Sequence, residues 1–284
     1  MTTSTAAPGG PLTAAELPRL VLSLRDRIER DRRQLFWLEG LRGLLNARRF
    51  GHRPAGVVWC RKLLPSSAAR RQVRAMEADG VPSAHLSPGR FRELAGLPRA
   101  SGVGLVLRQR WTPLAGVRAA DARPLLAVEG VRSAGNLGTM LRTAEAVGAP
   151  VACVGPRPDP FAPPAVRASM GGLAAGRVSR CSAAGLRQWA DGKGVRVLGL
   201  DPAGGLDWRD AAGGGPTAVV VGEERRGLTD AMRAACDALV SLPVRGQADS
   251  LNVGVAAGVM LYACLPKGPP DGRTDADGPQ SSIL

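Results

Sequence analysis

Apolar and polar positions alternate in blocks along the second half of the chain. Short apolar, often β-branched runs predict strands, and segments with helical apolar spacing predict helices between them. The expected strands are 125–129, 150–154, 195–200, 217–222 and 238–242, and the expected helices are 136–147, 164–172, 228–236 and 250–264. Such alternation is typical of a mostly parallel sheet covered on both faces. We therefore expect an α/β domain over residues 124–266, without the Gly-x-Gly-x-x-Gly turn of a conventional dinucleotide site.

The first half predicts a smaller α/β unit behind a helical segment. Leucines recur at helical spacing from Leu17 to Leu24, so we expect residues 14–45 to be mainly helix. Beyond them, the expected strands are 56–59, 81–86 and 102–107, and the expected helices are 66–78 and 88–94. These elements define a domain over residues 13–110, followed by a linker over 111–123. Residues 1–12 and 267–284 are expected to form a flexible and a disordered tail.

Positive charge is concentrated in the first half. The chain carries a formal net charge of +14, and residues 1–110 hold 20 Lys or Arg against 8 Asp or Glu, a net charge of +12. The remainder, with 18 against 16, is nearly neutral. A basic surface attracts polyanions, so RNA is the expected partner and the first half is expected to contact it. Aromatic residues make up only 4% of the chain, which disfavours base stacking as the main recognition device.

Cysteine and histidine usage disfavours metal and disulfide chemistry. Five cysteines are scattered without paired spacing, and only His52 and His85 accompany them, so no metal site is expected. Unpaired thiols fit a reducing cytoplasm. Residues 1–11 lack the basic start of a signal peptide, and the apolar run 251–265 is too short to span a bilayer. We expect a cytoplasmic protein without a membrane partner.

The segment 130–145 is the first of three polar turns that connect a strand to a helix. Asn136 is expected at the helix start, where its side-chain oxygen would satisfy a free backbone N–H. Gly138 and Arg142 lie one turn apart on one helix face, so Arg142 is expected over the space that Gly138 leaves open. Taken alone, the segment also fits an ordinary βα unit with a surface arginine.

Two later turns carry similar residues. One strand runs into Gly222 and the carboxylates Glu223 and Glu224, before a Gly-Leu-Thr turn opens the next helix. The last predicted strand runs into a polar loop. There Ser250 is the expected cap of a helix rich in small residues.

In order and spacing, the three turns resemble the motifs of the SpoU/TrmH-type RNA 2′-O-ribose methyltransferases of the SPOUT superfamily. The resemblance covers roughly residues 124–265, and its motifs contain Asn136, Gly138 and Arg142, then Gly222, Glu224, Gly227 and Leu228, then Ser250, Leu251 and Asn252. Two positions depart from the pattern. Glu223 stands where the family often has Asn or Ser, and Ser133 stands where an acidic residue is common. The composition also resembles that of the actinomycete rRNA methylases that confer antibiotic resistance.

This resemblance implies a fold, a cofactor and an assembly. It implies a deep trefoil knot in the C-terminal SPOUT domain. It also implies S-adenosylmethionine as cofactor, and a homodimer through that domain with a site completed across two subunits. The first half is similar in pattern to the L30e-like RNA-binding domain that precedes the catalytic domain in many members. Cofactor contacts are expected mainly from loop backbone at Leu200, Asp201, Val221, Gly222, Glu223, Leu242, Pro243 and Leu251.

Catalytic roles follow from the same resemblance. Arg142 is expected to orient the ribose and phosphate and to stabilise charge on the 2′ oxygen, because a guanidinium stays protonated. Asn136 would hold Arg142 or the ribose, and Glu224 would pin Arg142 or a group of the partner subunit. Ser250 and Asn252 would hydrogen-bond the nucleotide or pass its proton through water.

The expected reaction is S-adenosylmethionine-dependent 2′-O-methylation of RNA, with 23S rRNA as the target. A tRNA target is the nearest alternative, and a non-catalytic RNA-binding protein or a small-molecule methyltransferase on the same fold are two others. Arg167, Ser169 and Gly171 would either contact RNA phosphate or pack the helix that contains them.

Overall fold

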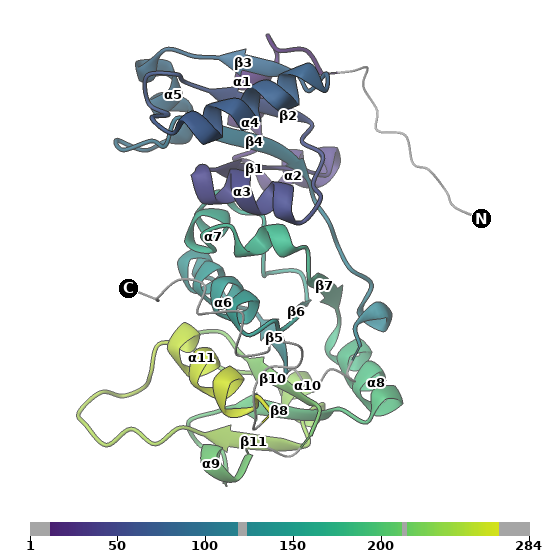
Figure 1. Ribbon diagram of the computed structural model, residues 1–284. Helices are drawn as coiled ribbons and strands as arrows, with labels where there is room; N and C mark the ends of the chain where they lie inside the picture. Colours follow the sequence, from purple (N-terminus) through teal and green to yellow (C-terminus); the bar gives the residue numbers. More distant parts are fainter. Residues whose placement is uncertain (1–11, 119–123, 212–214, 267–284) are drawn as a thin grey trace, which may run out of the picture.

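The computed structural model describes residues 12–118, 124–211 and 215–266. A four-stranded mixed sheet lies at one end of the molecule and a seven-stranded parallel sheet at the other (Figure 1). The tails expected at 1–12 and 267–284 fall outside the described residues, apart from Leu12. Residues 119–123 of the expected linker fall outside them as well.

The N-terminal sheet has the strand order β1-β4-β2-β3. In it, β4 (Val103–Arg108) pairs antiparallel with β1 (Leu35–Glu39) and β2 (Gly56–Trp59), and β2 pairs parallel with β3 (Ser83–His85). The described helices of this part are α1 (Leu17–Ser23), α2 (Arg27–Arg33), α3 (Leu41–Arg49), α4 (Ser67–Ala78) and α5 (Pro88–Ala95). The strands and helices predicted between residues 56 and 107 are confirmed, with small shifts at their ends.

The prediction that residues 14–45 are mainly helix is wrong. Asp26 interrupts the segment, because its carboxylate accepts hydrogen bonds from the amides of Ile28 (2.6 Å) and Glu29 (3.4 Å) and starts α2 anew. Gln34 then ends α2 with a left-handed φ of 55°. The apolar run that follows is strand β1, buried on both faces, whose continuous apolar pattern does not distinguish a strand from a buried helix.

The C-terminal sheet has the order β7-β6-β5-β10-β8-β11-β9, and every pairing in it is parallel. Its strands are β5 (Leu125–Glu129), β6 (Val151–Val154), β7 (Val178–Cys181), β8 (Arg196–Leu200), β9 (Leu206–Asp207), β10 (Thr217–Val221) and β11 (Ala238–Ser241). The described helices are α6 (Ala134–Ala146), α7 (Pro163–Ala168), α8 (Ala183–Lys193), α9 (Trp208–Ala211), α10 (Asp230–Ala234) and α11 (Val253–Ala263), with short 3-10 turns η1 (Leu114–Gly116) and η2 (Gly172–Ala175). The predicted parallel α/β fold is confirmed.

Helices cover both faces of this sheet, as the alternation in β5 illustrates. Leu126 and Val128 face the layer that contains α6 and α11, whereas Leu125 and Ala127 face the layer that contains α8 and α10. Because all four side chains are buried, the strand reads as an unbroken apolar run.

Four elements of this half were not predicted. Strand β7 carries the exposed Arg180 at the sheet edge, and β9 has only two residues, so neither forms an apolar run. Helices α8 and α9 contain polar or small residues that weaken the helical pattern. The helix expected at 164–172 ends earlier, because α7 stops at Ala168 and Met170 takes a left-handed φ of 50°.

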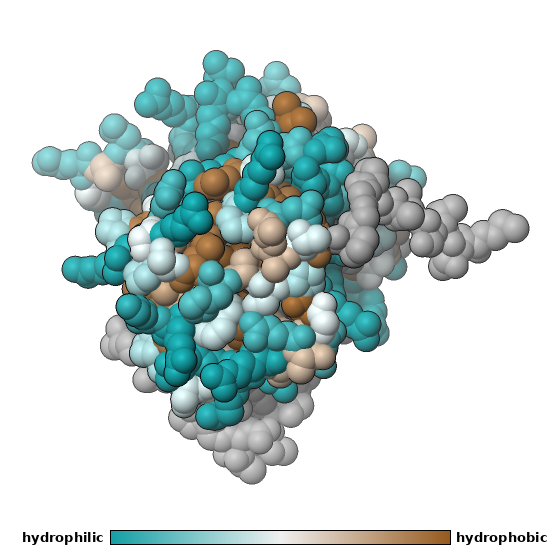
Figure 2. Space-filling view, turned by 90° about the horizontal axis from the view of Figure 1, so that it is seen from above, coloured by the Kyte–Doolittle hydropathy of each residue, from teal (hydrophilic) through white to brown (hydrophobic). Residues whose placement is uncertain are grey.

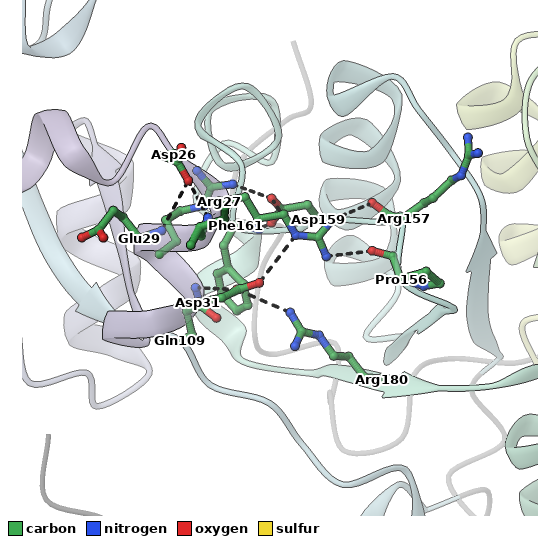
Figure 3. Close-up of polar contacts among 12 residues, drawn as sticks. Asp26, Arg27, Glu29, Asp31, Gln109, Pro156, Arg157, Asp159, Phe161 and Arg180 are labelled. Carbon is green, nitrogen blue, oxygen red and sulfur yellow. Dashed lines mark hydrogen bonds and ion pairs between the residues drawn. The ribbon is translucent and has the colours of Figure 1, made fainter. Parts of the chain in front are cut away.

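An ion-pair network docks the N-terminal sheet onto the parallel sheet. Arg30 of α2 is buried, and its Nη2 lies 2.5 Å from Oδ2 of Asp159, which follows β6. Around this pair, Arg27 Nη2 donates to the carbonyl oxygen of Pro156 at 2.7 Å, and Arg180 lies 3.6 Å from Asp31 (Figure 3). A buried cation requires such pairing, so the two halves meet in a defined orientation.

Apolar contacts continue across the same junction. The ring of Phe161 lies 4.9 Å from that of Phe36 and 5.1 Å from that of Trp111, and the Arg180 guanidinium lies 3.8 Å from the Trp111 ring. Buried residues of the two sheets therefore form one continuous core. The described part of the expected linker is anchored, because the Thr112 amide donates to the carbonyl oxygen of Val178 at 2.8 Å.

The surface of the N-terminal end is mostly hydrophilic, with apolar side chains gathered near the middle of the face that Figure 2 shows. Exposed arginines contribute much of this character, among them Arg42, Arg48 and Arg49 of α3. Within the described residues, no helix combines the length and apolar character that a bilayer crossing requires.

Candidate active site at the carboxyl ends of the parallel strands

The three polar turns meet because their strands are parallel. The turns follow β5, β10 and β11, and the carboxyl ends of parallel strands lie at one edge of the sheet, where α/β proteins bind their ligands. In Figure 1, the loop after β11 extends from the body of the molecule and returns into α11, which lies beside α6.

Asn136 joins the three turns through its side-chain amide. Its Nδ2 donates to Oε1 of Glu224 at 3.0 Å, and its Oδ1 accepts from Nδ2 of Asn252 at 3.0 Å. These residues come from three segments that are far apart in sequence. The amide therefore fixes the relative position of the loops after β5, β10 and β11.

Glu224 completes this junction by binding the backbone of the first turn. Its carboxylate accepts from the amides of Arg132 (3.2 Å) and Ser133 (3.1 Å). Burial favours the neutral acid, but the hydrogen bonds from Asn136 and the backbone amides outweigh burial, so the pKa of Glu224 lies below its usual value. Within the described residues, Glu224 thus holds Asn136 and a loop rather than Arg142.

Both predicted helix caps are displaced. Ser133 rather than Asn136 caps α6, since its hydroxyl accepts from the Asn136 amide at 3.2 Å. Asn252 rather than Ser250 caps α11, because its Oδ1 accepts from the amides of Gly254 (2.9 Å) and Val255 (3.3 Å). Because Ser133 and Asn252 cap the two helices, the side chains of Asn136 and Ser250 are not needed as caps and face the site.

Gly138 serves packing, and Arg142 does not cover it. A Cβ on Gly138 would collide with the carbonyl oxygen of Ala165 and the Cβ of Ala168, so α7 occupies the space that was expected for Arg142. Arg142 is exposed on α6 in line with Thr139, and it makes no hydrogen bond or ion pair with the described residues. Its guanidinium is therefore available to a ligand or a second chain.

A cleft of about 440 Å³ lies beside the junction. Seven of the eight residues expected at the cofactor line it, namely Leu200, Asp201, Val221, Gly222, Glu223, Leu242 and Leu251. Glu224, Ser250 and Asn252 line it as well. Pro243, Asn136 and Arg142 are not part of the lining.

The glycines of the second motif shape one wall of this cleft. A Cβ on Gly222 would collide with the backbone of Gly227. The Glu223 amide donates to the carbonyl oxygen of Gly227 at 3.0 Å, and the Gly227 amide donates back at 2.9 Å, with Gly227 at a φ of 68°. Only glycines fit this close, left-handed arrangement without strain.

Arg233 is a lining residue that sequence reasoning missed. It forms an ion pair with the buried carboxylate of Asp201, and its Nε donates to the carbonyl oxygen of Leu228 at 3.3 Å. It thereby links the loops after β8 and β10. An arginine in the last turn of a short helix gives no sequence sign of this role, because the position usually reads as solvated surface.

Glu223, which departs from the resembled pattern, is paired with arginines. Its carboxylate lies 3.2 Å from Arg132 Nε and 3.8 Å from Arg157 Nη1. The acidic residue thus offsets positive charge at the rim of the cleft instead of standing alone.

The thiols of this half are unsuited to nucleophilic chemistry at neutral pH. Burial raises the pKa of Cys153 to about 12 and that of Cys236 to about 11. Among the described residues, no three His, Cys, Asp or Glu side chains gather closely enough to hold a metal ion.

The fold and the site together define an α/β protein of the SpoU methylase class. Residues 123–262 match the SpoU rRNA Methylase family, and this part of the chain belongs to that family. The names of curated relatives are consistent with this family match. A protein from Mycolicibacterium vanbaalenii called an uncharacterized tRNA/rRNA methyltransferase is 39% identical over 146 residues, which are 50% of this chain and 46% of that protein. The match thus spans about half the length of such relatives.

Solved structures match over both halves. The AdoMet-bound rRNA methyltransferase from Sinorhizobium meliloti superposes with a TM-score of 0.80 at 28% identity, covering 89% of this chain and 96% of that one. The SpoU methyltransferase AviRb from Streptomyces viridochromogenes gives a TM-score of 0.78 at 26% identity, covering 87% and 95%. A structure called an RNA 2′-O ribose methyltransferase gives a TM-score of 0.73 at 26% identity, covering 92% and 96%.

Proposed function

We propose that this chain is an RNA methyltransferase that uses S-adenosylmethionine to methylate a ribose 2′-hydroxyl. The observation that carries the proposal is the joining of Asn136, Glu224 and Asn252 beside a cleft at the carboxyl ends of the strands. The family match supports methyl transfer to RNA. The likeness to the solved RNA 2′-O ribose methyltransferase supports the ribose as the acceptor. We place the reaction in the cytoplasm, with no membrane partner.

The cleft suits S-adenosylmethionine in size and lining. Small-molecule sites commonly combine apolar walls with a few placed polar groups. Leu200, Leu242 and Leu251 would contact the adenine ring, and the backbone of Val221 and Gly222 would bind its polar edge or the ribose. Asp201 would face the polar end of the cofactor, held in place by Arg233. When bound, the cofactor supplies an electrophilic methyl group on a sulfonium sulfur.

Arg142 is the group that would act on the nucleotide. Its exposed, unpaired guanidinium would hold the phosphate and stabilise negative charge at the 2′ oxygen. Asn136 is a positioning residue, because both of its amide atoms are already bound within the chain. Asn252 is one too, since its oxygen caps α11. Ser250 lines the cleft, and its hydroxyl has no partner in the described chain, so it would bind the nucleotide directly.

The exposed face of α11 supports a homodimer. Leu251, Val255 and Tyr262 are 43%, 53% and 54% exposed, an apolar stripe beside α6. A second copy packed on this stripe would remove it from water and would bring Arg142 of one copy toward the cleft of the other. Light scattering is expected to give twice the chain mass, and a fully active monomer would overturn this assembly.

The topology is compatible with the trefoil knot of the SPOUT superfamily. After β11 the chain makes a long loop and returns as α11, which packs on α6 and β10.

We also propose that the N-terminal domain, residues 13–110, is the L30e-like RNA-binding part, because it carries most of the net positive charge.

The substrate is proposed to be 23S rRNA, with tRNA as the alternative. Two solved structures match both halves of the chain. One is named an rRNA methyltransferase and the other a SpoU methyltransferase, and the first of these names favours rRNA. The curated relatives carry names that cover both RNA classes.

Methyl transfer from radiolabelled S-adenosylmethionine to separated 23S rRNA, 16S rRNA and tRNA tests the proposal. Label in 23S rRNA, recovered in dinucleotides that resist alkaline hydrolysis, is the expected result. Arg142→Ala should abolish the label, and Arg209→Ala, at an exposed position of the nearly neutral half, should not. Alkali-sensitive label would place the methyl group on a base, and label only in tRNA would replace the substrate.

A further inference from the structure

A second cavity, of about 760 Å³, lies where the two halves of the chain meet. Its walls come from α1, β1 and the start of α3 on one side, from the segment 94–101, and from α7 and the turn after it. No residue of the cofactor cleft belongs to it. The docking of the two sheets therefore creates a site that neither half forms alone.

The interior of this cavity is apolar. Leu24, Leu94 and Val166 contribute buried side chains to the lining. Trp37 also lines it and is 9% exposed, with its indole Nε1 buried away from the accessible surface. These side chains offer an apolar wall to an occupant, as small-molecule sites commonly do.

Positive charge surrounds the opening. Arg42, Arg99 and Arg167 are exposed and form no ion pair or hydrogen bond with the described residues. Arg25 differs, because its guanidinium donates to the carbonyl oxygens of Glu93 (2.9 Å) and Leu94 (3.2 Å) and closes the end of α5. Three free guanidinium groups around an apolar hollow suit a ligand with a flat ring and negatively charged oxygens.

The carboxylate of Glu39 gives the cavity lining a hydrogen-bond acceptor. Oε1 of Glu39 accepts from the amide (3.0 Å) and the hydroxyl (3.1 Å) of Ser101. Its second oxygen accepts no hydrogen bond from the described residues. The free carboxylate oxygen in an otherwise apolar hollow suits the exocyclic amino group of a nucleobase, which donates hydrogen bonds.

The cavity is connected to the proposed reaction centre through the turn after α7. Met170 stands at its edge, 43% exposed and with a φ of 50° that is unusual for a residue other than glycine. The turn is held by Asn46, whose Nδ2 donates to the carbonyl oxygen of Gly171 at 3.2 Å. A Cβ on Gly172 would lie 3.4 Å from the Cα of Arg142. A strand of RNA bound at Arg142 would therefore lie near the turn that borders the cavity.

From these features we propose that the cavity binds one unstacked nucleotide of the substrate RNA. The base would enter the apolar hollow against Trp37 and Met170, and the flanking phosphates would lie on Arg42, Arg99 and Arg167. This inference rests on the proposed function for the identity of the ligand as RNA. It explains how a chain with few aromatic residues would still select a particular RNA, since one shaped cavity replaces a stacking platform.

Photo-crosslinking of the full chain to single-stranded RNA that contains thiouridine tests the proposal without requiring activity. Crosslinks are expected in the peptides that contain Trp37 or Met170. RNA affinity, measured by fluorescence anisotropy, should fall about tenfold in Arg42→Ala/Arg99→Ala. The matched control, Lys193→Ala/Arg209→Ala in the nearly neutral half, removes the same charge at exposed positions elsewhere and should change affinity about twofold or less.

Trp37→Phe supplies a second variant that keeps an aromatic ring but shortens the apolar wall of the cavity. It should lower RNA affinity while leaving S-adenosylmethionine affinity unchanged, with a modest fall in melting temperature because Trp37 is buried. Competition with nucleoside monophosphates distinguishes the source of the ligand. Displacement of the RNA crosslink only at millimolar monophosphate supports an RNA nucleotide, whereas displacement at micromolar concentrations would assign the cavity to a free nucleotide.

The methyltransferase function and the nucleotide site can each be refuted independently of the other. If the protein methylates RNA but the cavity variants behave as the Lys193→Ala/Arg209→Ala control does, the nucleotide site is refuted and the function stands. If no RNA is methylated but the crosslinks fall in the cavity and weaken in the variants, the site stands and the methyltransferase proposal is refuted. Crosslinks outside both named peptides would overturn the inference.

Discussion

Asn252 donates its side-chain amide to Oδ1 of Asn136 at 3.0 Å, although 116 residues separate them. The other end of Asn136 donates to Glu224. An amide is suited to this position because it can donate to a carboxylate and accept from another amide at once. An ionised carboxylate in its place has no hydrogen to donate and would lose Glu224 as a partner.

Substitution of Asn136 should therefore reveal the geometry of the junction. Asn136→Ala removes both hydrogen bonds and should slow methyl transfer about tenfold. Asn136→Asp places a second carboxylate 3.0 Å from that of Glu224 and should slow it about tenfold further at neutral pH. Since protonation of either acid relieves the repulsion, the Asp variant should recover relative to Ala as the pH falls. Equal rates for the two variants at every pH would contradict the arrangement.

Arg142 should matter to turnover and not to folding. Arg142→Ala is expected to reduce single-turnover methylation by on the order of 10²–10³, the usual loss for one preorganised donor. Arg142→Lys should also be poor, because an ammonium does not reproduce the planar fork. Both variants should keep the wild-type melting temperature and S-adenosylmethionine affinity, since the side chain is exposed and makes no hydrogen bond or ion pair with the described residues. Near-normal turnover in Arg142→Ala would return it to the role of a surface arginine.

Gly138→Ala should destabilise the protein through packing alone. The added Cβ would meet the backbone of α7, which cannot move aside as a flexible side chain can. The cost should be about 1–3 kcal/mol in the free energy of unfolding, measured by urea denaturation. Gly135→Ala is the control on the same helix, because its Cβ would meet only the Ser133 hydroxyl, at 3.7 Å. Helix propensity favours alanine at both positions, so a comparable loss in both variants would show that the contact with α7 does not decide the effect.

His52 should make stability depend on pH. Burial lowers its pKa, Arg110 lowers it further, and the hydrogen bond from Nε2 to the carbonyl oxygen of Ala174 (2.7 Å) opposes them only in part. Folding thus favours the neutral ring, so the stabilisation is complete above the unfolded pKa of about 6.5 and is lost as the pH falls toward the lower folded value.

Thermal melting between about pH 8 and about pH 5 measures this effect. The wild-type midpoint should decline below about pH 6.5, and His52→Gln should show a smaller decline. His85→Gln, at the exposed end of β3, should follow the wild-type curve. A decline that is unchanged in His52→Gln would assign the pH dependence to other groups.

RNA binding by the full chain should weaken steeply with salt, and mainly through the first half. Each phosphate-contacting arginine that is removed lowers the slope of log affinity against log salt by about one. Arg48→Ala and Arg49→Ala on α3 should each have this effect. Arg209→Ala should not, because Arg209 is paired with Asp207 in the nearly neutral half. Equal slopes for all three variants would contradict the proposed division of labour.

The sequence predicted the parallel sheet because the alternation of apolar strands and amphipathic helices is a local pattern. Strand β1 was missed because Phe36, Trp37 and Leu38 are buried on both faces, which gives no period-two alternation. The caps were assigned to Asn136 and Ser250 rather than to Ser133 and Asn252 because several capping residues cluster at each helix start, and only geometry selects one of them.

Contacts between distant segments were beyond sequence reasoning altogether. The ion pair between Arg233 and Asp201, and that between Arg30 and Asp159, join residues whose surroundings read as solvated surface. Their pairing depends on how the elements pack, and one sequence does not record that packing.

The buried pair of Arg30 and Asp159 also constrains how this protein can be exchanged with its relatives. A chimera that joins the first half of this chain to the second half of a relative would leave the buried charge of Arg30 unmatched unless that half supplies a carboxylate in place of Asp159. The rings of Phe36, Trp111 and Phe161 impose a similar condition on shape. Grafting the basic half alone therefore succeeds only where the acceptor provides both the matching charge and the matching aromatic surface.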